Sequence, residues 1–262
     1  MNINRIFFSP TGTTDKITEQ IAMSLGESVK DYDLTLLKNR IKYEKLNFTG
    51  DDLVIVGVPV YGGRIPEFLE NYFSVFKGNN TPTIFTVVYG NRDYDDALLD
   101  LKDLFEKRGF RGIAAGAFIG EHSYTEKVAT ARPDAVDLSL AAEFGEKCKA
   151  VLTDFETGGK NYVLNVKGNY PYKERKPGAS MVPQTNSEKC IDCGVCAQVC
   201  PMEAIDFNDY KNVDATKCIH CCSCVKKCPE HAKSFNHEVF LAIQQRLIDT
   251  CVLERKEPEM FF

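Results

Sequence analysis

Two copies of one cysteine pattern constrain this chain more than any other feature of its sequence. In each copy, three cysteines are separated by two residues, and a fourth follows after three more and precedes a proline. The copies are Cys190, Cys193, Cys196 and Cys200 before Pro201, and Cys218, Cys221, Cys224 and Cys228 before Pro229. Nine of the eleven cysteines lie between residues 190 and 228, and such crowding indicates metal ligands rather than scattered core thiols.

The expected compartment supports this interpretation. Residues 1–5 lead directly into an apolar run without a signal-peptide core, and no apolar run approaches the ~20 residues that span a bilayer. We therefore expect a cytoplasmic protein with no membrane span, where thiols stay reduced and disulfides are rare. The net charge of −5, with no basic tract, argues against nucleic-acid binding.

The spacing of the cysteines predicts how they share their metal. Three thiolates two residues apart can surround three corners of a cubic cluster, but the fourth cannot easily reach the same cube, and in two-cluster ferredoxins it ligates the other cluster. One [4Fe–4S] cluster is therefore assigned to Cys190, Cys193, Cys196 and Cys228. The other is assigned to Cys218, Cys221, Cys224 and Cys200.

A zinc site is the main alternative for these cysteines. Zinc uses four ligands, commonly on two separated CxxC arms, and requires neither the third cysteine nor the Cys-Pro ending. Two complete motifs also favour two [4Fe–4S] clusters over a [3Fe–4S] variant. The motifs closely resemble those of bacterial 2[4Fe–4S] ferredoxins. Cys222 lies outside the pattern and is interpreted as a buried thiol, with an alternative ligand as the second interpretation.

The first 157 residues alternate strand and helix signals. The expected strands are residues 3–8, 34–37, 53–58, 83–89 and 113–119, and the expected helices are residues 14–25, 66–76, 94–108 and 133–155. This alternation predicts an α/β fold, with a doubly wound, five-stranded parallel sheet covered on both faces. Ligands of such sheets bind at the carboxyl ends of the strands, near the topological switch point.

Four segments follow from these patterns. They are a first domain at 1–159, a linker or arm rich in proline and glycine at 160–187, a small α+β domain at 188–237, and a closing helix and tail at 238–262. Residues 160–177 hold five basic residues and one acidic residue. We interpret this run as a solvated connector, with a docking surface for an acidic partner as the alternative.

A hydroxyl-rich turn after the first expected strand is typical of an anion site. The residues concerned are Ser9, Thr11, Gly12, Thr13 and Thr14, directly before a helix whose first N–H groups are free to bind an anion. The turn lacks the lysine of a nucleoside-triphosphate loop, so neutral donors holding a phosphate monoester fit it better. An ordinary helix cap is the alternative.

Two further loops at the same edge of the sheet offer aromatic rings and glycines. Their candidate residues are Pro59, Val60, Tyr61, Gly62 and Gly63 in the first, and Tyr89, Gly90, Asn91 and Tyr94 in the second. A tyrosine can stack on a planar ring while exposed glycine backbone bonds its edge. Together with the phosphate turn, they predict FMN. His122, in a third loop, is interpreted as a structural residue, with a role near the flavin as the alternative.

Nearly the whole chain resembles the flavodoxin–ferredoxin fusion family of anaerobic bacteria and archaea. The resemblance is carried by the phosphate turn, residues 88–92, residues 121–124, the arm at 170–173 and the cysteine repeats. It implies a flavodoxin-like FMN domain, two [4Fe–4S] clusters and electron transfer between them, with redox proteins as partners.

Three functions fit such a fusion. The leading hypothesis is an electron carrier that converts between one-electron donors and a flavin. The second is a flavin-dependent reductase of a quinone, nitro compound or other small-molecule acceptor, and the third is a redox sensor. The arm is long enough for the cluster domain to fold over the flavin edge, either within the chain or onto a second subunit of a homodimer.

Overall fold

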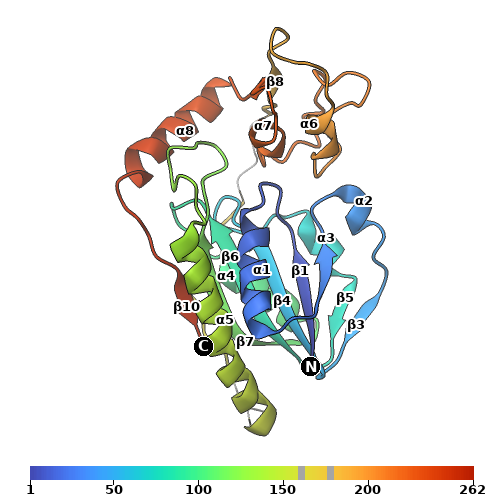
Figure 1. Cartoon of the computed structure of the whole chain (residues 1–262), viewed down its shortest axis with the longest axis vertical. Coiled ribbons are helices and arrows are strands. Elements are labelled where there is room, and N and C mark those ends of the chain that lie inside the picture. The colour runs from blue at the N-terminus through green and yellow to red at the C-terminus, as the bar shows by residue number, and fades with distance from the viewer. Residues whose placement is uncertain (159–162, 176–179) are drawn as a thin grey trace.

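The structure is a computed structural model that describes residues 1–158, 163–175 and 180–262. Its centre is a sheet of five parallel strands (Figure 1). In spatial order they are β2 (Val29–Asp33), β1 (Asn2–Phe7), β4 (Asp52–Pro59), β6 (Thr81–Tyr89) and β7 (Phe110–Ile119). This is the strand order of flavodoxin-like doubly wound proteins, so the predicted fold class is confirmed.

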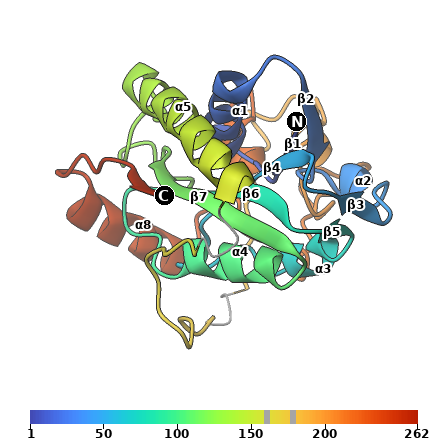
Figure 2. The ribbon, with the colours of Figure 1, turned by 90° about the horizontal axis from the view of Figure 1, so that it is seen from below.

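Helices cover both faces of this sheet (Figure 2). On one face lie α1 (Thr13–Leu25) and α5 (Ala135–Gly158), and on the other lie α3 (Leu69–Phe73) and α4 (Ala97–Glu106). All nine residues of β6 and six of the eight residues of β4 are buried. Strands buried on two faces require near-continuous apolar runs, which explains why their sequence signals were strong.

Two elements expected from the sequence lie at other positions in the structure. The strand expected at residues 34–37 lies earlier, at β2, where only Tyr32 is fully buried, while α2 (Leu37–Arg40) begins within the expected range. The helix expected at residues 66–76 is confined to α3, because Phe76 starts β5 (Phe76–Gly78), which pairs with β3 (Leu46–Phe48) in a small separate sheet. Edge strands with few buried residues carry weak periodicity.

The arm and the tail both pack on the first domain. Leu164 of the arm is buried in the core beside α4, and Tyr172 donates to Asp103 at 2.6 Å. The tail ends in β10 (Glu259–Phe261), which pairs antiparallel with β7 and adds a sixth strand to the sheet. The expected tail is therefore part of the sheet, and the chain returns to its first domain after the cysteine region.

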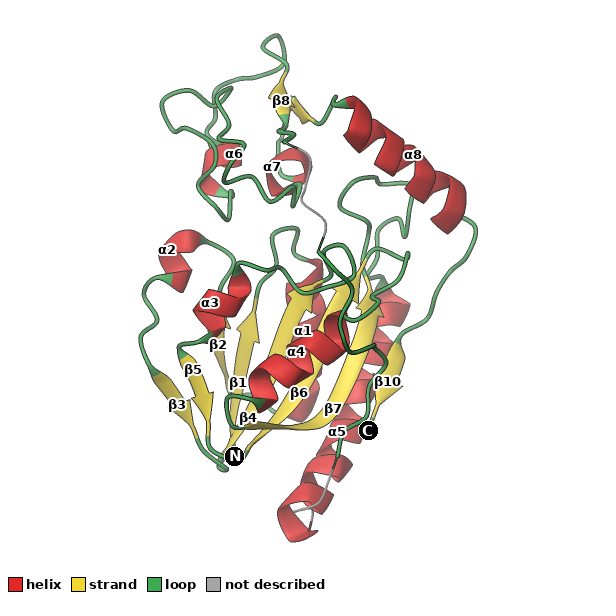
Figure 3. Ribbon diagram, turned by 180° about the vertical axis from the view of Figure 1, so that it is seen from behind, coloured by secondary structure: helices red, strands yellow, loops and turns green. Residues whose placement is uncertain are grey.

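The cysteine region lies above the carboxyl ends of the parallel strands (Figure 3). Its elements are β8 (Gln184–Thr185), α6 (Val195–Gln198), α7 (Ser223–Lys226) and β9 (Lys233–Ser234). The closing helix α8 (Glu238–Cys251) connects the two parts, since Phe240 packs on Cys222 and Leu247 packs on Val128. The cysteine region thus lies over the carboxyl edge of the parallel strands of its own chain. No helix among the described residues is long and apolar enough to cross a membrane.

Candidate functional site

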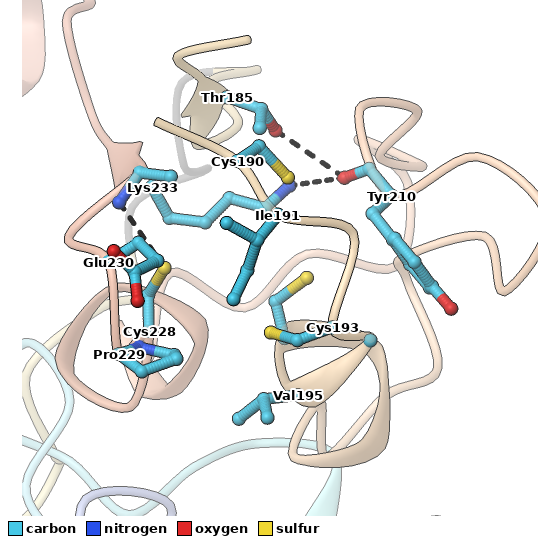
Figure 4. Close-up of a pocket in the computed structure, with 13 residues that line it drawn as sticks. Thr185, Cys190, Ile191, Cys193, Val195, Tyr210, Cys228, Pro229, Glu230 and Lys233 are labelled. Atoms are coloured by element: carbon cyan, nitrogen blue, oxygen red, sulfur yellow. Dashed lines mark hydrogen bonds between the residues drawn. The ribbon is translucent and has the colours of Figure 1, made fainter. Parts of the chain in front are cut away.

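The first cysteine cavity lies before α6 in the upper part of the cysteine region. It is lined by Cys190, Cys193, Cys196 and Cys228, and Figure 4 shows the first, second and fourth of these thiols around a common space. Positive φ angles at Asp192 and Gly194 turn the loop before α6. The Cys228 sulfur accepts a hydrogen bond from the Ala232 N–H at 3.2 Å. Hydrogen bonds of this kind to cluster thiolates influence reduction potentials.

The second cavity has a mostly apolar lining. Its cysteines are Cys200, Cys218, Cys221, Cys224 and the surplus Cys222. The structure therefore gathers each predicted set of four around its own cavity, including the crossed pair Cys200 and Cys228. Within the described residues, no three His, Cys, Asp or Glu side chains are grouped to hold a single metal ion.

Burial raises the pKa of two thiols of the second set. It raises the pKa of the Cys221 thiol to about 12 and raises the pKa of Cys224 as well. The thiols are therefore protonated when no metal is bound, and loading with metal must release their protons. Cys222, with φ of 60°, is buried beside Phe235 and Phe240, as expected for a structural thiol.

The hydroxyl-rich turn has the features of an anion cradle. Gly12 caps α1 with φ of 88°, and a Cβ there would meet no atom within 4 Å, so open space lies before the helix. The buried Thr14 hydroxyl has no hydrogen-bond partner among the described residues. Ser9 braces the turn, because its hydroxyl accepts from the Asp15 N–H at 2.9 Å and its N–H donates to Thr35 at 3.0 Å. Thr11 and Thr13 are half-buried in the same turn. An unpaired buried donor at a helix N-terminus fits the phosphate of FMN.

The loop after β4 lies against the second cysteine cavity. Gly62 and Gly63 have φ of 62° and 90° and form the tight turn in which Tyr61 N–H donates to the Arg64 carbonyl at 2.9 Å. Before this turn, Pro59 ends β4 and Val60 N–H donates to the Val88 carbonyl at 3.0 Å. Desolvation, followed by the charges of Cys221 and Cys222, raises the pKa of Tyr61 well above its ordinary value. The tyrosine predicted to contact the flavin is therefore next to the second cysteine set.

Two predicted side chains of the loop after β6 contact the C-terminal segment. The Asn91 amide donates to the carbonyls of Cys251 and Glu254 at 2.9 and 2.6 Å, and the Tyr94 hydroxyl donates to Glu259 at 2.9 Å. Both side chains therefore hold the returning C-terminal segment, and their contact with a flavin stays a prediction. The sequence of the loop alone contains no sign of these partners, which are about 160 residues away.

Tyr89, Gly90 and His122 form a packed corner of the same edge. Tyr89 is buried with its ring centroid 5.4 Å from that of Tyr94. A Cβ on Gly90 would lie 2.4 Å from the His122 ring, so glycine is required there. The imidazole accepts from the Tyr124 N–H at 3.1 Å, and burial lowers the pKa of His122 to about 4. These contacts favour the structural interpretation of His122.

Contacts between the two parts of the chain lie at this same edge. Ser223, fully buried between two cavity cysteines, donates to the carbonyl of Pro10 in the phosphate turn at 2.8 Å. Lys226 pairs with Glu121 of the third loop. Sequence reasoning missed these residues, because a serine and a lysine within a cysteine motif give no sign of their partners.

Comparisons with known proteins also distinguish two parts of the chain. Residues 6–125 match a family model described as a flavodoxin domain, and residues 182–239 match one described as a 4Fe-4S dicluster domain. No curated protein matches the chain.

Solved structures similar to the chain include several flavodoxins. One from the domain Archaea is 12% identical, with a TM-score of 0.41 over 58% of this chain and 99% of its own. One from Streptococcus pneumonia TIGR4 is 16% identical, with a TM-score of 0.40 over 57% and 99%. The two-electron reduced flavodoxin of Megasphaera elsdenii is 15% identical, with a TM-score of 0.37 over 55% and 98%.

The two matched domains identify the chemistry of the chain. A flavodoxin domain implies FMN, and a 4Fe-4S dicluster domain implies iron–sulfur clusters. Both are redox-carrier domains, which implies electron transfer with redox partners. The chain is a flavodoxin–ferredoxin fusion, with a flavodoxin domain at its N-terminal side and a 4Fe-4S dicluster domain at its C-terminal side.

Proposed function

We propose that this protein passes electrons between two [4Fe–4S] clusters and one FMN in the same chain. Cys190, Cys193, Cys196 and Cys228 would hold the first cluster, and Cys200, Cys218, Cys221 and Cys224 the second. The phosphate of FMN would lie in the turn from Ser9 to Thr14, with its ring near Tyr61 and the exposed Gly62. The domain limits would be 1–159, 188–237 and 238–262, with an arm at 160–187.

The proximity of the second cysteine set to the flavin edge carries this proposal. Ser223 lies between the ligands Cys221 and Cys224 and bonds the Pro10 carbonyl at 2.8 Å, inside the phosphate turn. Tyr61 also lies close enough to Cys221 and Cys222 for their thiolate forms to raise its pKa. The first cavity lies farther along the cysteine region, where Ile191 and Cys193 are exposed. The order of the sites is therefore partner, first cluster, second cluster, flavin.

Three properties of the chain support electron transfer between the clusters and the flavin. Flavin accepts one or two electrons whereas each cluster carries one, so the pair of sites converts between the two kinds of donor. Covalent linkage raises the effective concentration of each site for the other. The Lys226–Glu121 pair and α8 hold the cysteine region in place over the loops.

A reductase of a small acceptor is the competing function. Such an acceptor must approach the flavin ring at the edge where Ser223 and Lys226 already contact two loops. This cover favours the adaptor function, in which the cysteine region is the electron path to the ring.

Disruption of the second cluster in the full chain tests the proposal. Truncation after the first domain is unsuitable, because it also removes Leu164 from the core and β10 from the sheet. Cys221→Ala should retain FMN and lose the second cluster. Its flavin should then be reduced by a low-potential ferredoxin at least about tenfold more slowly, whereas dithionite should still reduce it. The matched control is Cys148→Ala, which removes a buried thiol on α5 far from both cavities.

The result can also contradict the proposal. Unchanged reduction of the flavin by the ferredoxin donor in Cys221→Ala would place the second cluster off the electron path. Continued turnover of a quinone or nitro compound by the same variant after chemical reduction would favour the reductase.

A further inference from the structure

Arg40, the last residue of α2, is a buried cation held between the two domains. It is 2% exposed, although α2 itself lies near the surface of the flavodoxin domain. One terminal nitrogen donates to the carbonyls of Leu34 and Thr35, both at 2.9 Å. The other donates to the carbonyl of Pro201 and lies 3.5 Å from the Met202 sulfur. Arg40 of the flavodoxin domain therefore binds Pro201, the residue directly after the proposed cluster ligand Cys200.

The charge of Arg40 has no ion-pair partner in the part of the chain that the structure describes. Among the ion pairs formed by the described residues, none includes Arg40. Its guanidinium carbon lies 5.1 Å from the Phe68 ring centroid and 4.9 Å from that of Tyr72. Its Nε is buried without a hydrogen-bond partner among the described residues. Asp33 and Glu203 favour its charged form without forming an ion pair with it. An arginine stays protonated in proteins, so this charge needs compensation from elsewhere.

A cluster in the neighbouring cavity would supply that compensation. A cluster with four thiolate ligands carries a net negative charge, which becomes more negative when it accepts an electron. Pro201 and Met202, both in contact with Arg40, also line the cavity of Cys200, Cys218, Cys221 and Cys224. The buried cation therefore contacts two residues that line the cavity of the expected anion.

We propose that Arg40 is the positioning residue and the counter-charge of the second cluster. It holds the Cys200–Pro201 segment against the flavodoxin domain and raises the reduction potential of the cluster next to the flavin. A higher potential of the second cluster favours transfer of the electron from the first cluster to the second, from which it passes to the flavin ring. Arg40 is also connected to the phosphate turn through Thr35. It donates to the Thr35 carbonyl, and the Thr35 hydroxyl accepts from the Ser9 N–H. The inference rests on the proposed cluster assignment.

The test measures the midpoint potential of each cluster by EPR-monitored titration of the holoprotein. Arg40→Gln keeps one amide donor and removes the charge, whereas Arg40→Met keeps packing against the two rings. A unit charge removed at roughly 10 Å, in a medium of effective dielectric constant about 20, changes a one-electron equilibrium by on the order of tenfold. That corresponds to a shift of about 59 mV to more negative potential, in the second cluster alone. The signal of this cluster is identified from Cys200→Ser, which perturbs one of its ligands.

Two further variants serve as controls. Arg40→Lys should keep the potential closer to that of the unmodified protein than either neutral variant does. Arg246→Gln removes the same charge from the exposed face of α8 and should leave both potentials nearly unchanged, because solvent screens it. Unshifted potentials in a folded neutral variant, or equal shifts of both clusters, would overturn the role of Arg40. A preparation without two clusters would instead overturn the proposed function.

Discussion

Thr14 offers a direct test of the phosphate cradle. Its side chain lies in the first turn of α1 and is 1% exposed, yet its hydroxyl has no hydrogen-bond partner among the described residues. A buried hydroxyl without a partner costs about 1–3 kcal/mol. We infer that the phosphate of FMN offsets this cost. Thr14→Val removes the hydroxyl while it keeps nearly the same shape.

Thr14→Val should stabilise the flavin-free protein but weaken the binding of FMN. Without FMN, the variant loses an unsatisfied polar group and should be more stable by on the order of 1 kcal/mol. With FMN, it loses a charge-assisted hydrogen bond of about 1.5–3 kcal/mol. The dissociation constant of FMN should therefore rise by about 10- to 150-fold. Riboflavin, which lacks the phosphate, should bind both proteins with similar, weak affinity.

The measurements are fluorescence titration with FMN and with riboflavin, and urea unfolding of flavin-free protein that retains its clusters. Thr18→Val is the matched control, because Thr18 is also buried on α1, but its hydroxyl donates to the Thr14 carbonyl at 3.0 Å. This control should lose stability and change the FMN dissociation constant by no more than about twofold. If Thr14→Val binds FMN normally, or is less stable without FMN, the assignment of the cradle is refuted.

Three further predictions concern the metal content, the crossed ligands and one histidine. Protein prepared without oxygen should contain about eight irons, about eight sulfides and one FMN per chain, whereas about four irons, or zinc, would contradict the assignment. Cys200→Ala should remove the EPR signal of the cluster at Cys218, and loss of the cluster at Cys190 instead would contradict crossed ligation. The folded-state pKa of His122, about 4, lies below its ordinary 6.5, so the unfolded state binds the proton first as the pH falls. The free energy of unfolding should thus decrease from about pH 6.5 towards pH 4, and His122→Gln should lessen this decrease in urea unfolding measured across that range.

Local patterns were sufficient for the fold class and for the two cysteine sets. Strands such as β4 and β6 are buried on both faces, so their apolar runs are continuous and easy to recognise. β2 was misplaced because only Tyr32 of this edge strand is fully buried. The cysteine sets were predictable because ligand spacing within a motif is itself a local constraint, and each set lines one cavity of the structure.

The sequence by itself determined the chemistry of the sites, whereas only the tertiary structure decided how they meet. Asn91 and Tyr94 resembled flavin contacts because they follow a strand in a glycine-containing loop, yet they hold a tail about 160 residues away. Arg40 and Ser223 bond partners 161 and 213 residues distant in the sequence. Neither contact leaves a periodic or spacing signal, because each depends on how the chain folds back over the sheet. The position of the second cysteine set beside the phosphate turn is therefore a property of the packed chain, set by buried hydrogen bonds and charges between segments far apart in sequence.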